Sequence, residues 1–292
     1  MTAPRIVVLI PYFGHWPFWM DFYLESMRWN PAIDWRFYTD CGEPANAPPN
    51  ASFIECSFEE YQRRVSDALG IDFRPAGPYK LCDIKPAYGY IHAAEISDYD
   101  YWAFGDIDIV YGDIMGFITP HMLQHSLISF HQRRVSGHFT LLANTAFARE
   151  AFMQEPTWRT VFERPEHTAF DEKSFGEMFM RHKDWPHWLR RMVYYRNPYM
   201  RSACFTEAYS TSFGRVAWED GSYDFPEHWV WRDGLLSCDK STARHFPYLH
   251  FLEWKKLWDQ RASTELVHGD RARLAEGFEI SREGFTVTPA PS

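Results

Sequence analysis

The sequence predicts an α/β protein in which a doubly wound mixed sheet carries helices on both faces. Three observations predict this class. The apolar run 6–10 is continuous and rich in β-branched residues, as in strands buried on both faces. Segments of strand and helix character alternate after it. A second apolar run, 101–105, leads into Asp106 and Asp108, and open α/β sheets bind ligands beyond the carboxyl ends of their strands.

The first half of the chain supplies most of the expected sheet. Pro11 ends the first strand, and Pro17 suits the first turn of a helix that Pro31 closes. Ser57 and Glu60 have the spacing of a capping box at a helix start. In order, we expect a strand at 6–10, a helix at 17–29, a strand at 35–38, a loop at 44–50, a strand at 52–56, a helix from 57 and a helix at 86–95.

The second half is expected to complete this core and then to become less regular. The expected elements are strands at 126–131 and 138–143 and helices at 145–153 and 172–181. The segment 185–231 is aromatic, rich in arginine and weakly periodic, which favours long loops in an adaptable lobe over a second compact domain. Beyond residue 261 the chain turns polar, so we expect the last ~10 residues to be poorly ordered.

The composition narrows the class of protein further. The 292 residues, with 46% hydrophobic side chains and 13 Trp, suffice for one large α/β domain. A net charge of −9 argues against a nonspecific nucleic-acid binder. Five cysteines without paired spacing argue against a disulfide framework or a structural zinc site and favour a reducing cytoplasm. No stretch approaches the roughly 20 apolar residues of a membrane span, so any membrane association is expected to be peripheral.

Asp106 and Asp108 are the most informative residues of the chain. On a strand, whose side chains have a period of two, they would point to the same face. Two neighbouring carboxylates repel each other and lose hydration when partly buried, which favours a cation between them. Isolated pairs of this kind are also common in loops, so the interpretation depends on the surrounding residues.

The surrounding segments carry a resemblance to known enzymes. They are 10–14 (IPYFG), 37–40 (FYTD), 79–86 (YKLCDIKP), 106–108 (DID) and 136–140 (SGHFT). In this order they resemble a bacterial family of GT-A-type glycosyltransferases associated with polysaccharide synthesis. More distantly, they are similar to retaining nucleotide-sugar transferases of the glycogenin and lipopolysaccharide galactosyltransferase type. The resemblance spans roughly residues 5–256 and implies a Rossmann-like GT-A fold whose DxD motif binds Mn²⁺ or Mg²⁺.

The resemblance also implies a nucleotide pocket at the end of the first strand. The residues implied there are Pro11, Tyr12 and Phe13, with Asp40 or Asp83 contacting the base or ribose. An Asp at a strand end can accept hydrogen bonds from ribose hydroxyls. The alternative for Asp40 is a simple turn residue.

Lys80, Asp83 and Lys85 concentrate charge just before the helix expected at 86. An anionic donor would meet two cations and a helix N-terminus at this place. The alternative interpretation is a solvated capping cluster.

The late segment 244–256 is the second constellation that indicates a metal and phosphate site. A neutral imidazole can ligate a divalent ion beside two carboxylates, and a lysine a turn later can hold a diphosphate. By resemblance, His250 with Lys255 or Lys256 fits this pattern, and His245 competes with His250. The glycine that relatives carry between histidine and lysine is missing, which leaves the choice of lysine open. A core histidine that bonds a carbonyl is the alternative.

Asp171 and Glu172 are the candidate catalytic carboxylates. By resemblance, a carboxylate at this place acts as the general base in inverting transferases and holds the sugar or acceptor in retaining ones. Alternatively, Asp171 caps a helix and Glu172 lies in its first turn.

Gly137 and His138 are expected to face the sugar, because glycine lets a ligand approach the backbone, although a plain turn is equally compatible with the sequence.

Most of the 13 tryptophans are expected in the core, because each buries a large area. Trp229 and Trp231 alternate in the loop-rich lobe, and we nominate them as acceptor contacts.

The residues and the resemblance together predict a metal-dependent glycosyltransferase that uses a nucleotide-diphosphate sugar and a glycan or lipid-linked acceptor. UDP is the default nucleotide by resemblance only. A catalytic domain at 1–260 would comprise a nucleotide-sugar half at 1–115 and an acceptor half at 116–260, followed by a polar extension at 261–292. The expected location is the cytoplasm or the inner face of the membrane. A nucleotide-sugar hydrolase or phosphoesterase and a noncatalytic glycan-binding protein are the alternatives.

Overall fold

The computed structural model describes residues 3–181, 185–212, 216–218, 220–241 and 243–288. Its central feature is a seven-stranded mixed sheet with the strand order β3-β2-β1-β4-β7-β6-β8. Within this sheet only β7 is antiparallel to its neighbours. The strands are β1 (Ile6–Pro11), β2 (Ile33–Thr39), β3 (Ala51–Glu55), β4 (Tyr101–Gly105), β6 (Leu127–Ser129), β7 (Phe139–Ala143) and β8 (Ala203–Phe205).

Strand β1 lies at the centre of the sheet and is buried on both faces. Val7 and Leu9 contribute to one hydrophobic cluster, and Ile6, Val8 and Ile10 contribute to a second cluster on the opposite face. This confirms the prediction of a doubly covered sheet, because the alternation of a strand sends successive side chains to opposite faces.

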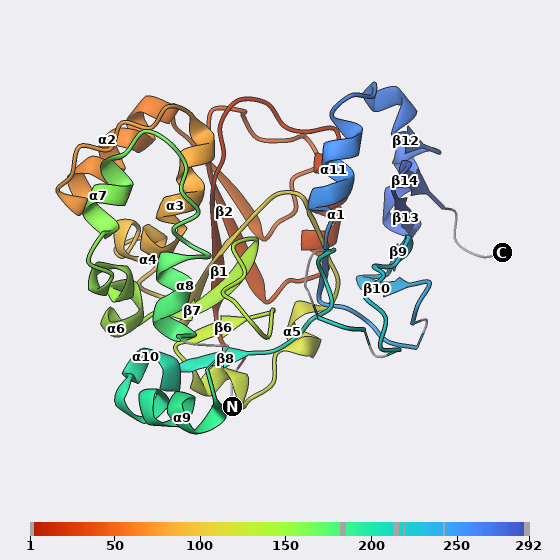
Figure 1. Ribbon diagram of the computed structural model, residues 1–292. Helices are drawn as coiled ribbons and strands as arrows, with labels where there is room; N and C mark the ends of the chain where they lie inside the picture. The colour runs from red at the N-terminus through yellow and green to blue at the C-terminus, as the bar shows by residue number, and fades with distance from the viewer. Residues whose placement is uncertain (1–2, 182–184, 213–215, 219, 242, 289–292) are drawn as a thin grey trace.

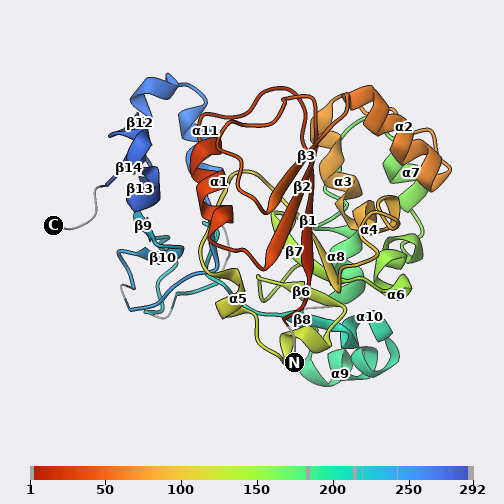
Figure 2. The ribbon, with the colours of Figure 1, turned by 180° about the vertical axis from the view of Figure 1, so that it is seen from behind.

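Helices cover both faces of this sheet (Figures 1 and 2). One face is covered by α2 (Phe58–Leu69), α3 (Leu81–Ile84), α4 (Tyr88–Ile91), α6 (Ala146–Arg149), α7 (Trp158–Glu163) and α8 (Ser174–Phe179). The other is covered by α1 (Met20–Arg28) and α5 (Ile114–Phe117). Helix α2 begins with the predicted capping box, in which the Ser57 hydroxyl accepts a hydrogen bond from the Glu60 amide and the Glu60 carboxylate accepts one from the Ser57 amide.

A second sheet of five strands, in the order β10-β9-β13-β14-β12, packs beyond α1 and α11 (Leu252–Trp258) (Figure 1). Its strands are β9 (His228–Arg232), β10 (Leu235–Cys238), β12 (Val267–His268), β13 (Phe278–Ser281) and β14 (Gly284–Val287). A third hydrophobic cluster joins this sheet to the rest of the molecule, since it combines Phe22 of α1 with Trp231 and Phe285. Strands β5 (Ile109–Tyr111) and β11 (Tyr248–His250) form a separate antiparallel pair.

Three segments have a secondary structure that differs from the sequence-based expectation. The helix expected at 86–95 is the short α4 followed by turns. The segment 185–231, expected as loops, contains α9 (His187–Arg196), α10 (Pro198–Arg201), β8 and β9. The segment from 261, expected as a polar extension, supplies β12, β13 and β14, which extend the sheet from β9, and the final residues 289–292 lie outside the described residues.

The remaining regular elements are α11 (Leu252–Trp258) and short 3₁₀ helices at Pro78–Lys80, Lys85–Ala87, Met122–Gln124, Ala151–Gln154, Ser263–Glu265 and Arg271–Glu276. In the described part of the chain, none of the helices has the length and apolar character needed to cross a membrane.

Candidate functional site

A cavity of about 460 Å³ opens where β1 and β4 end at their carboxyl termini. This cavity is lined by most of the residues that the sequence analysis selected as site residues. These are Pro11, Tyr12, Phe13, Lys85, Asp106, Asp108, Gly137, His138, Asp171, Glu172, His250 and Lys255. The position agrees with the rule that open α/β sheets bind ligands at the carboxyl edge of their strands.

The acidic pair lies in the turn between β4 and β5 and not on a strand, which corrects the expectation that a strand sets the direction of its side chains. The Asp106 amide donates to the His138 carbonyl at 2.9 Å, and the Trp19 indole donates to the Ile107 carbonyl at 2.9 Å. These two hydrogen bonds hold the turn, and both carboxylates still point into the same cavity.

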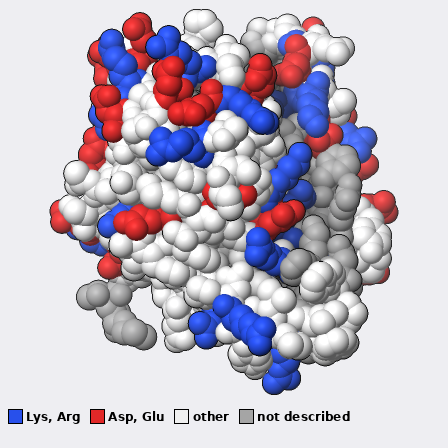
Figure 3. All heavy atoms as spheres, turned by 60° about the vertical axis from the view of Figure 1, so that its left-hand side comes forward, with Lys and Arg blue, Asp and Glu red and all other residues white. Residues whose placement is uncertain are grey.

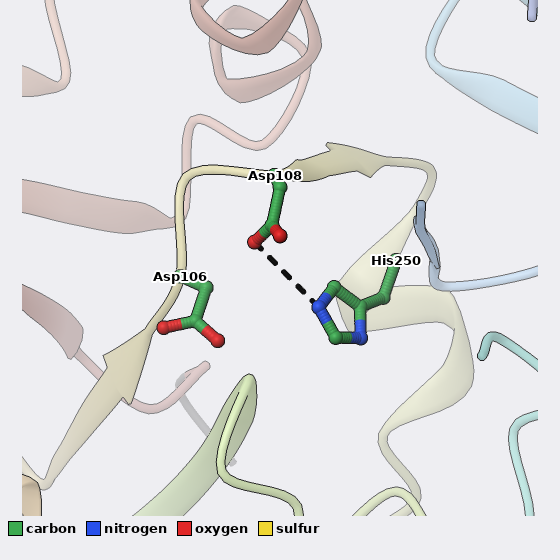
Figure 4. Close-up of side chains that lie close together, drawn as sticks. All are labelled: Asp106, Asp108 and His250. Atoms are coloured by element: carbon green, nitrogen blue, oxygen red, sulfur yellow. Dashed lines mark ion pairs between the residues drawn. The ribbon is translucent and has the colours of Figure 1, made fainter. Parts of the chain in front are cut away.

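Strand pairing brings His250 to the acidic pair from a distant part of the sequence. In the β5–β11 ladder His250 is opposite Ile109, the residue after Asp108. The Phe251 amide also donates to the Asp108 carbonyl at 3.1 Å. Figure 4 shows the result, with the Asp106, Asp108 and His250 side chains converging on one place.

One nitrogen of the His250 imidazole is in a hydrogen bond, and the other has no hydrogen-bond partner among the described residues. Its Nδ1 lies 3.2 Å from the Thr211 hydroxyl, and its ring stacks on His138 at 4.2 Å between ring centroids. Its Nε2 is buried, lacks a hydrogen-bond partner among the described residues, and lies 3.6 Å from an Asp108 oxygen. A buried nitrogen of this kind is costly unless something binds it.

A divalent cation fits this arrangement. Asp106, Asp108 and His250 each offer one ligand atom, and these atoms lie within 4.8 Å of one another. Two carboxylate oxygens would suit a hard cation such as Mn²⁺ or Mg²⁺, and a neutral imidazole nitrogen could serve as a further metal ligand.

Two lysines flank the acidic pair. The Lys85 ammonium donates to Asp106 Oδ1 at 2.5 Å and to the Gly137 carbonyl at 2.9 Å. The Lys255 ammonium donates to Asp108 Oδ2 at 2.5 Å. Lys85 is buried, whereas the Lys255 side chain is 32% exposed, so Lys255 is the more accessible of the two cations.

These pairings fix the charges of the site. Burial alone would raise the pKa of Asp108, but the neighbouring His250 and Lys255 hold it well below its usual value. Burial would likewise lower the pKa of Lys85, but the charge of Asp106 holds it well above the ordinary value. The site therefore combines an ionised Asp108 carboxylate with the Lys85 and Lys255 ammonium groups.

Asp171 differs from the other carboxylates of the cavity. It is only 4% exposed, and burial, with further contributions from the charges of Glu172 and Asp106 and against the opposing effect of Lys85, raises its pKa to about 7. A Cβ atom on Gly137 would come within 2.7 Å of an Asp171 oxygen, so glycine at this position lets the carboxylate approach the backbone. The Asp171 carboxylate is thus poised to exchange a proton near neutral pH.

Lys80 and Asp83 lie outside the cavity lining, because their polar atoms are used inside the protein. Asp83 accepts hydrogen bonds from the Lys80 ammonium and from the backbone amides of Thr168 and Phe170, at 2.8 to 2.9 Å. The Lys80 ammonium also donates to two backbone carbonyls of the segment 161–166. The pair thus anchors the loop that leads to Asp171 and does not face the nucleotide pocket that the sequence implied.

Asp40 and Lys256 were also selected as site residues, and neither lines the cavity. The Asp40 carboxylate accepts a hydrogen bond from the Gly14 amide at 2.8 Å, so it joins two loops at the carboxyl edge without lining the cavity. Lys256 is exposed and pairs with Glu253, which leaves Lys255 as the lysine of the cavity.

Trp229 and Trp231 are fully buried in the third hydrophobic cluster. Their nomination as acceptor contacts is therefore wrong, because a buried ring cannot meet an acceptor.

The cavity also contains residues that sequence reasoning missed. Tyr79, which is 71% exposed, packs edge-on against His167 at 4.6 Å between ring centroids, and both line the cavity. Tyr79 stands in the segment that carries the resemblance, whereas no local signal marks His167. Cys82 lines the cavity as well, and burial raises its pKa to about 12, so it remains a thiol at neutral pH.

The fold and the cavity define an α/β protein with a candidate ligand site at the carboxyl edge of its larger sheet. The chain belongs to the family of unknown function DUF6625, whose sequence model matches residues 8–287. No curated protein sequence matches the chain.

Three solved structures illustrate what the fold is similar to. The glycosyltransferase GlyE of Streptococcus pneumoniae TIGR4 is 9% identical with a TM-score of 0.35, and the match covers 71% of this chain and 46% of GlyE. A glycosyltransferase involved in the glycosylation of the major capsid of PBCV-1 is 10% identical with a TM-score of 0.36, covering 71% and 83%. Mouse xyloside xylosyltransferase 1 is 10% identical with a TM-score of 0.39, covering 85% and 97%.

Proposed function

We propose that the protein is a metal-dependent glycosyltransferase that moves a sugar from a nucleotide-diphosphate donor to a hydroxyl of a glycan or lipid-linked acceptor. The observation that carries the proposal is the convergence of Asp106, Asp108 and His250 in a cavity flanked by Lys85 and Lys255, with a His250 nitrogen that has no hydrogen-bond partner among the described residues. UDP is the proposed nucleotide by resemblance, and the proposed pathway is surface polysaccharide synthesis in the cytoplasm.

In this proposal Asp106, Asp108 and His250 hold Mn²⁺ or Mg²⁺. When bound, the cation neutralises charge on the departing diphosphate. Lys255 is the residue best suited to contact that diphosphate, because it lies beside Asp108 and is partly exposed. Lys85 fixes the direction of the Asp106 carboxylate through its bonds to Asp106 and to the Gly137 carbonyl.

Asp171 is the proposed proton acceptor for the acceptor hydroxyl, with Glu172 beside it. A general base works best when its pKa lies near the working pH, and the raised pKa of Asp171, about 7, meets this condition. Gly137 and His138 would face the sugar from the start of β7, and residues 11–13 would contact the nucleotide at the end of β1. The division into a nucleotide-sugar half at 1–115 and an acceptor half at 116–260 belongs to the same proposal.

An assay of UDP and sugar release tests the proposed function. The protein is incubated with a panel of UDP-sugars and Mn²⁺, with and without oligosaccharide acceptors, and both UDP and free sugar are measured. A transferase releases UDP faster when its acceptor is present and leaves little free sugar. Equal UDP and free sugar, unaffected by any acceptor, would instead identify a nucleotide-sugar hydrolase.

A glycan-binding protein without catalysis is the remaining alternative. It would bind oligosaccharides in EDTA and release no UDP with any donor. Its main support in the sequence is the aromatic content, and the burial of Trp229 and Trp231 removes part of that support.

A further inference from the structure

Helix α9 presents large apolar side chains to solvent. Trp188, Met192 and Tyr195 are 64%, 51% and 57% exposed. Their spacing of four and three residues places them on one face of the helix. None of the α9 side chains that the structure describes is buried. A face of this kind is unfavourable in water unless something covers it.

The same face is cationic. Arg191 and Arg196 are exposed next to the apolar side chains, and the Arg191 guanidinium lies over the Tyr195 ring, 5.6 Å from its centroid. The segment 185–206 contains four arginines and no Asp, Glu or Lys, although the whole chain has a net charge of −9. In Figure 3 the lower end of the molecule, where α9 and α10 lie in Figure 1, shows Lys and Arg side chains but no Asp or Glu on that face.

We propose that α9 docks the protein on the surface of an anionic lipid bilayer. Arginines alone would fit any polyanion, but exposed Trp, Met and Tyr gain free energy only where they leave water. A bilayer interface offers both partners, because its anionic headgroups attract the arginines and its acyl boundary accepts the apolar side chains. The inference goes beyond the proposed function and does not depend on it.

The topology places this surface away from the cavity. Strand β8 follows α10 directly and is parallel to β6, so α9 and α10 lie at the amino end of β8, on the side of the sheet opposite its carboxyl edge. The cavity lies at the carboxyl ends of β1 and β4. A protein docked through α9 would therefore keep its cavity open to a soluble nucleotide and to a glycan that extends from the membrane.

Cosedimentation of the full chain with vesicles tests the proposal. The probes are vesicles of phosphatidylcholine mixed with phosphatidylglycerol, and vesicles of phosphatidylcholine alone. We expect the protein to sediment with the anionic vesicles, less so at high salt because salt screens the arginines. Both Trp188→Ser/Tyr195→Ser and Arg191→Glu/Arg196→Glu should lower the vesicle partition coefficient about tenfold or more.

A matched control substitutes an exposed tyrosine and an exposed arginine elsewhere. Tyr223 is 73% exposed and the Arg74 side chain is 82% exposed, and Tyr223→Ser/Arg74→Glu should sediment like the wild type. Unchanged melting temperatures show that each variant is folded. Nucleotide binding in the presence of Mn²⁺ should also be the same in all of them, which separates this inference from the proposed function.

Two results would overturn the inference. The first is a folded wild type that stays in the supernatant with anionic vesicles at low salt. The second is a Trp188→Ser/Tyr195→Ser variant that sediments as well as the wild type, because binding through the arginines alone would indicate a soluble polyanion or an acidic protein as the partner.

Discussion

Burial disfavours the charged form of the Asp171 carboxylate and raises its pKa. Both the activity and the stability of the protein should therefore depend on pH. A general base must be ionised, so we expect kcat/KM to rise with pH and to level off above pH 7, near the raised pKa of about 7. Asp171→Asn should lose this dependence together with most of the activity. A variant that keeps the wild-type pH profile would rule out Asp171 as the base.

The same raised pKa predicts the sign of a stability change. In the unfolded chain Asp171 loses its proton near the ordinary aspartate pKa of 3.8, whereas the folded protein keeps it up to about 7. The folded state therefore binds more protons between these values, and stability should fall as pH rises from about 4 to about 7, by at most about 4 kcal/mol. Melting curves across this range should show a smaller fall for Asp171→Asn than for the wild type.

Lys255 and Lys256 are adjacent lysines that make a matched pair of variants. Lys255 contacts Asp108 in the cavity, whereas Lys256 pairs with Glu253 on the surface. Lys255→Met should weaken UDP binding in Mn²⁺ about tenfold or more, because a charged hydrogen bond is lost, and Lys256→Met should leave it unchanged. Titration calorimetry measures both, and equal effects of the two substitutions would contradict the assignment of Lys255.

Most of the residues that the sequence analysis selected line the cavity, but their contacts there could not be predicted. The acidic pair was a candidate because two neighbouring carboxylates favour a cation, whereas His250 was chosen over His245 only by the resemblance to known transferases. The choice of Lys255 over Lys256 depends on which face of α11 meets Asp108, and the sequence alone does not show that face. His167 could not be predicted, because it enters the cavity through a loop held by the buried Asp83.

At the scale of elements, a buried ion pair anchors the loop that carries Asp171. Lys80 and Asp83 have side chains that are 1% and 0% exposed. Burial would raise the pKa of Asp83, but hydrogen bonds from Lys80 and from the Phe170 and Thr168 amides hold it below its usual value. Ala169, inside this loop, has a φ of 58°, a strained value for a residue with a side chain. The ion pair stabilises this strained turn next to the cavity.

Removing only Lys80 should lower the free energy of unfolding more than neutralising both Lys80 and Asp83. Lys80→Met should lower the free energy of unfolding by about 3–5 kcal/mol, because it leaves the Asp83 charge buried without its partner. Lys80→Met/Asp83→Asn should recover part of this loss, since the amide still accepts hydrogen bonds. Urea unfolding of the two single variants and the double variant gives the coupling energy. A double variant that loses the sum of the two single losses would contradict the account.

Helices and strands could be predicted where the residues that define them are close together in the sequence. The capping box of α2 and the apolar run of β1 are examples, because each depends on residues close in sequence. The β5–β11 ladder is different, since it joins Ile109 to His250 across a large part of the chain and no local pattern encodes it. The turn at Asp106 is likewise fixed by distant groups, the Trp19 indole and the His138 carbonyl.

At the scale of the whole molecule, the second sheet joins the end of the chain to its first helix. The polar composition after residue 261 led us to expect no such sheet. The apolar residues nevertheless alternate along these strands and are buried, namely Phe278 and Ile280 in β13 and Phe285 and Val287 in β14. The Trp258 indole donates to the Arg282 carbonyl at 2.7 Å, which ties α11 to the same region.

A chain that ends at residue 260 should therefore fold poorly. It would lose β12, β13 and β14 and uncover Phe22, Trp231 and Trp258, which are fully or almost fully buried. Exposure of such a surface favours aggregation. Soluble yield and melting temperature compare the two chains, and a soluble truncated protein with the melting temperature of the full chain would show that the second sheet is dispensable.

The central claim is that Asp106, Asp108 and His250 form a cation site that supports the binding of a nucleotide diphosphate. It is tested most directly by the thermal shift that UDP and UDP-sugars cause in Mn²⁺ and in EDTA, for the wild type and for Asp106→Asn/Asp108→Asn. We predict a rise in melting temperature that requires both nucleotide and Mn²⁺ and is lost in the folded variant. A nucleotide shift that persists in EDTA or in the variant would contradict the claim.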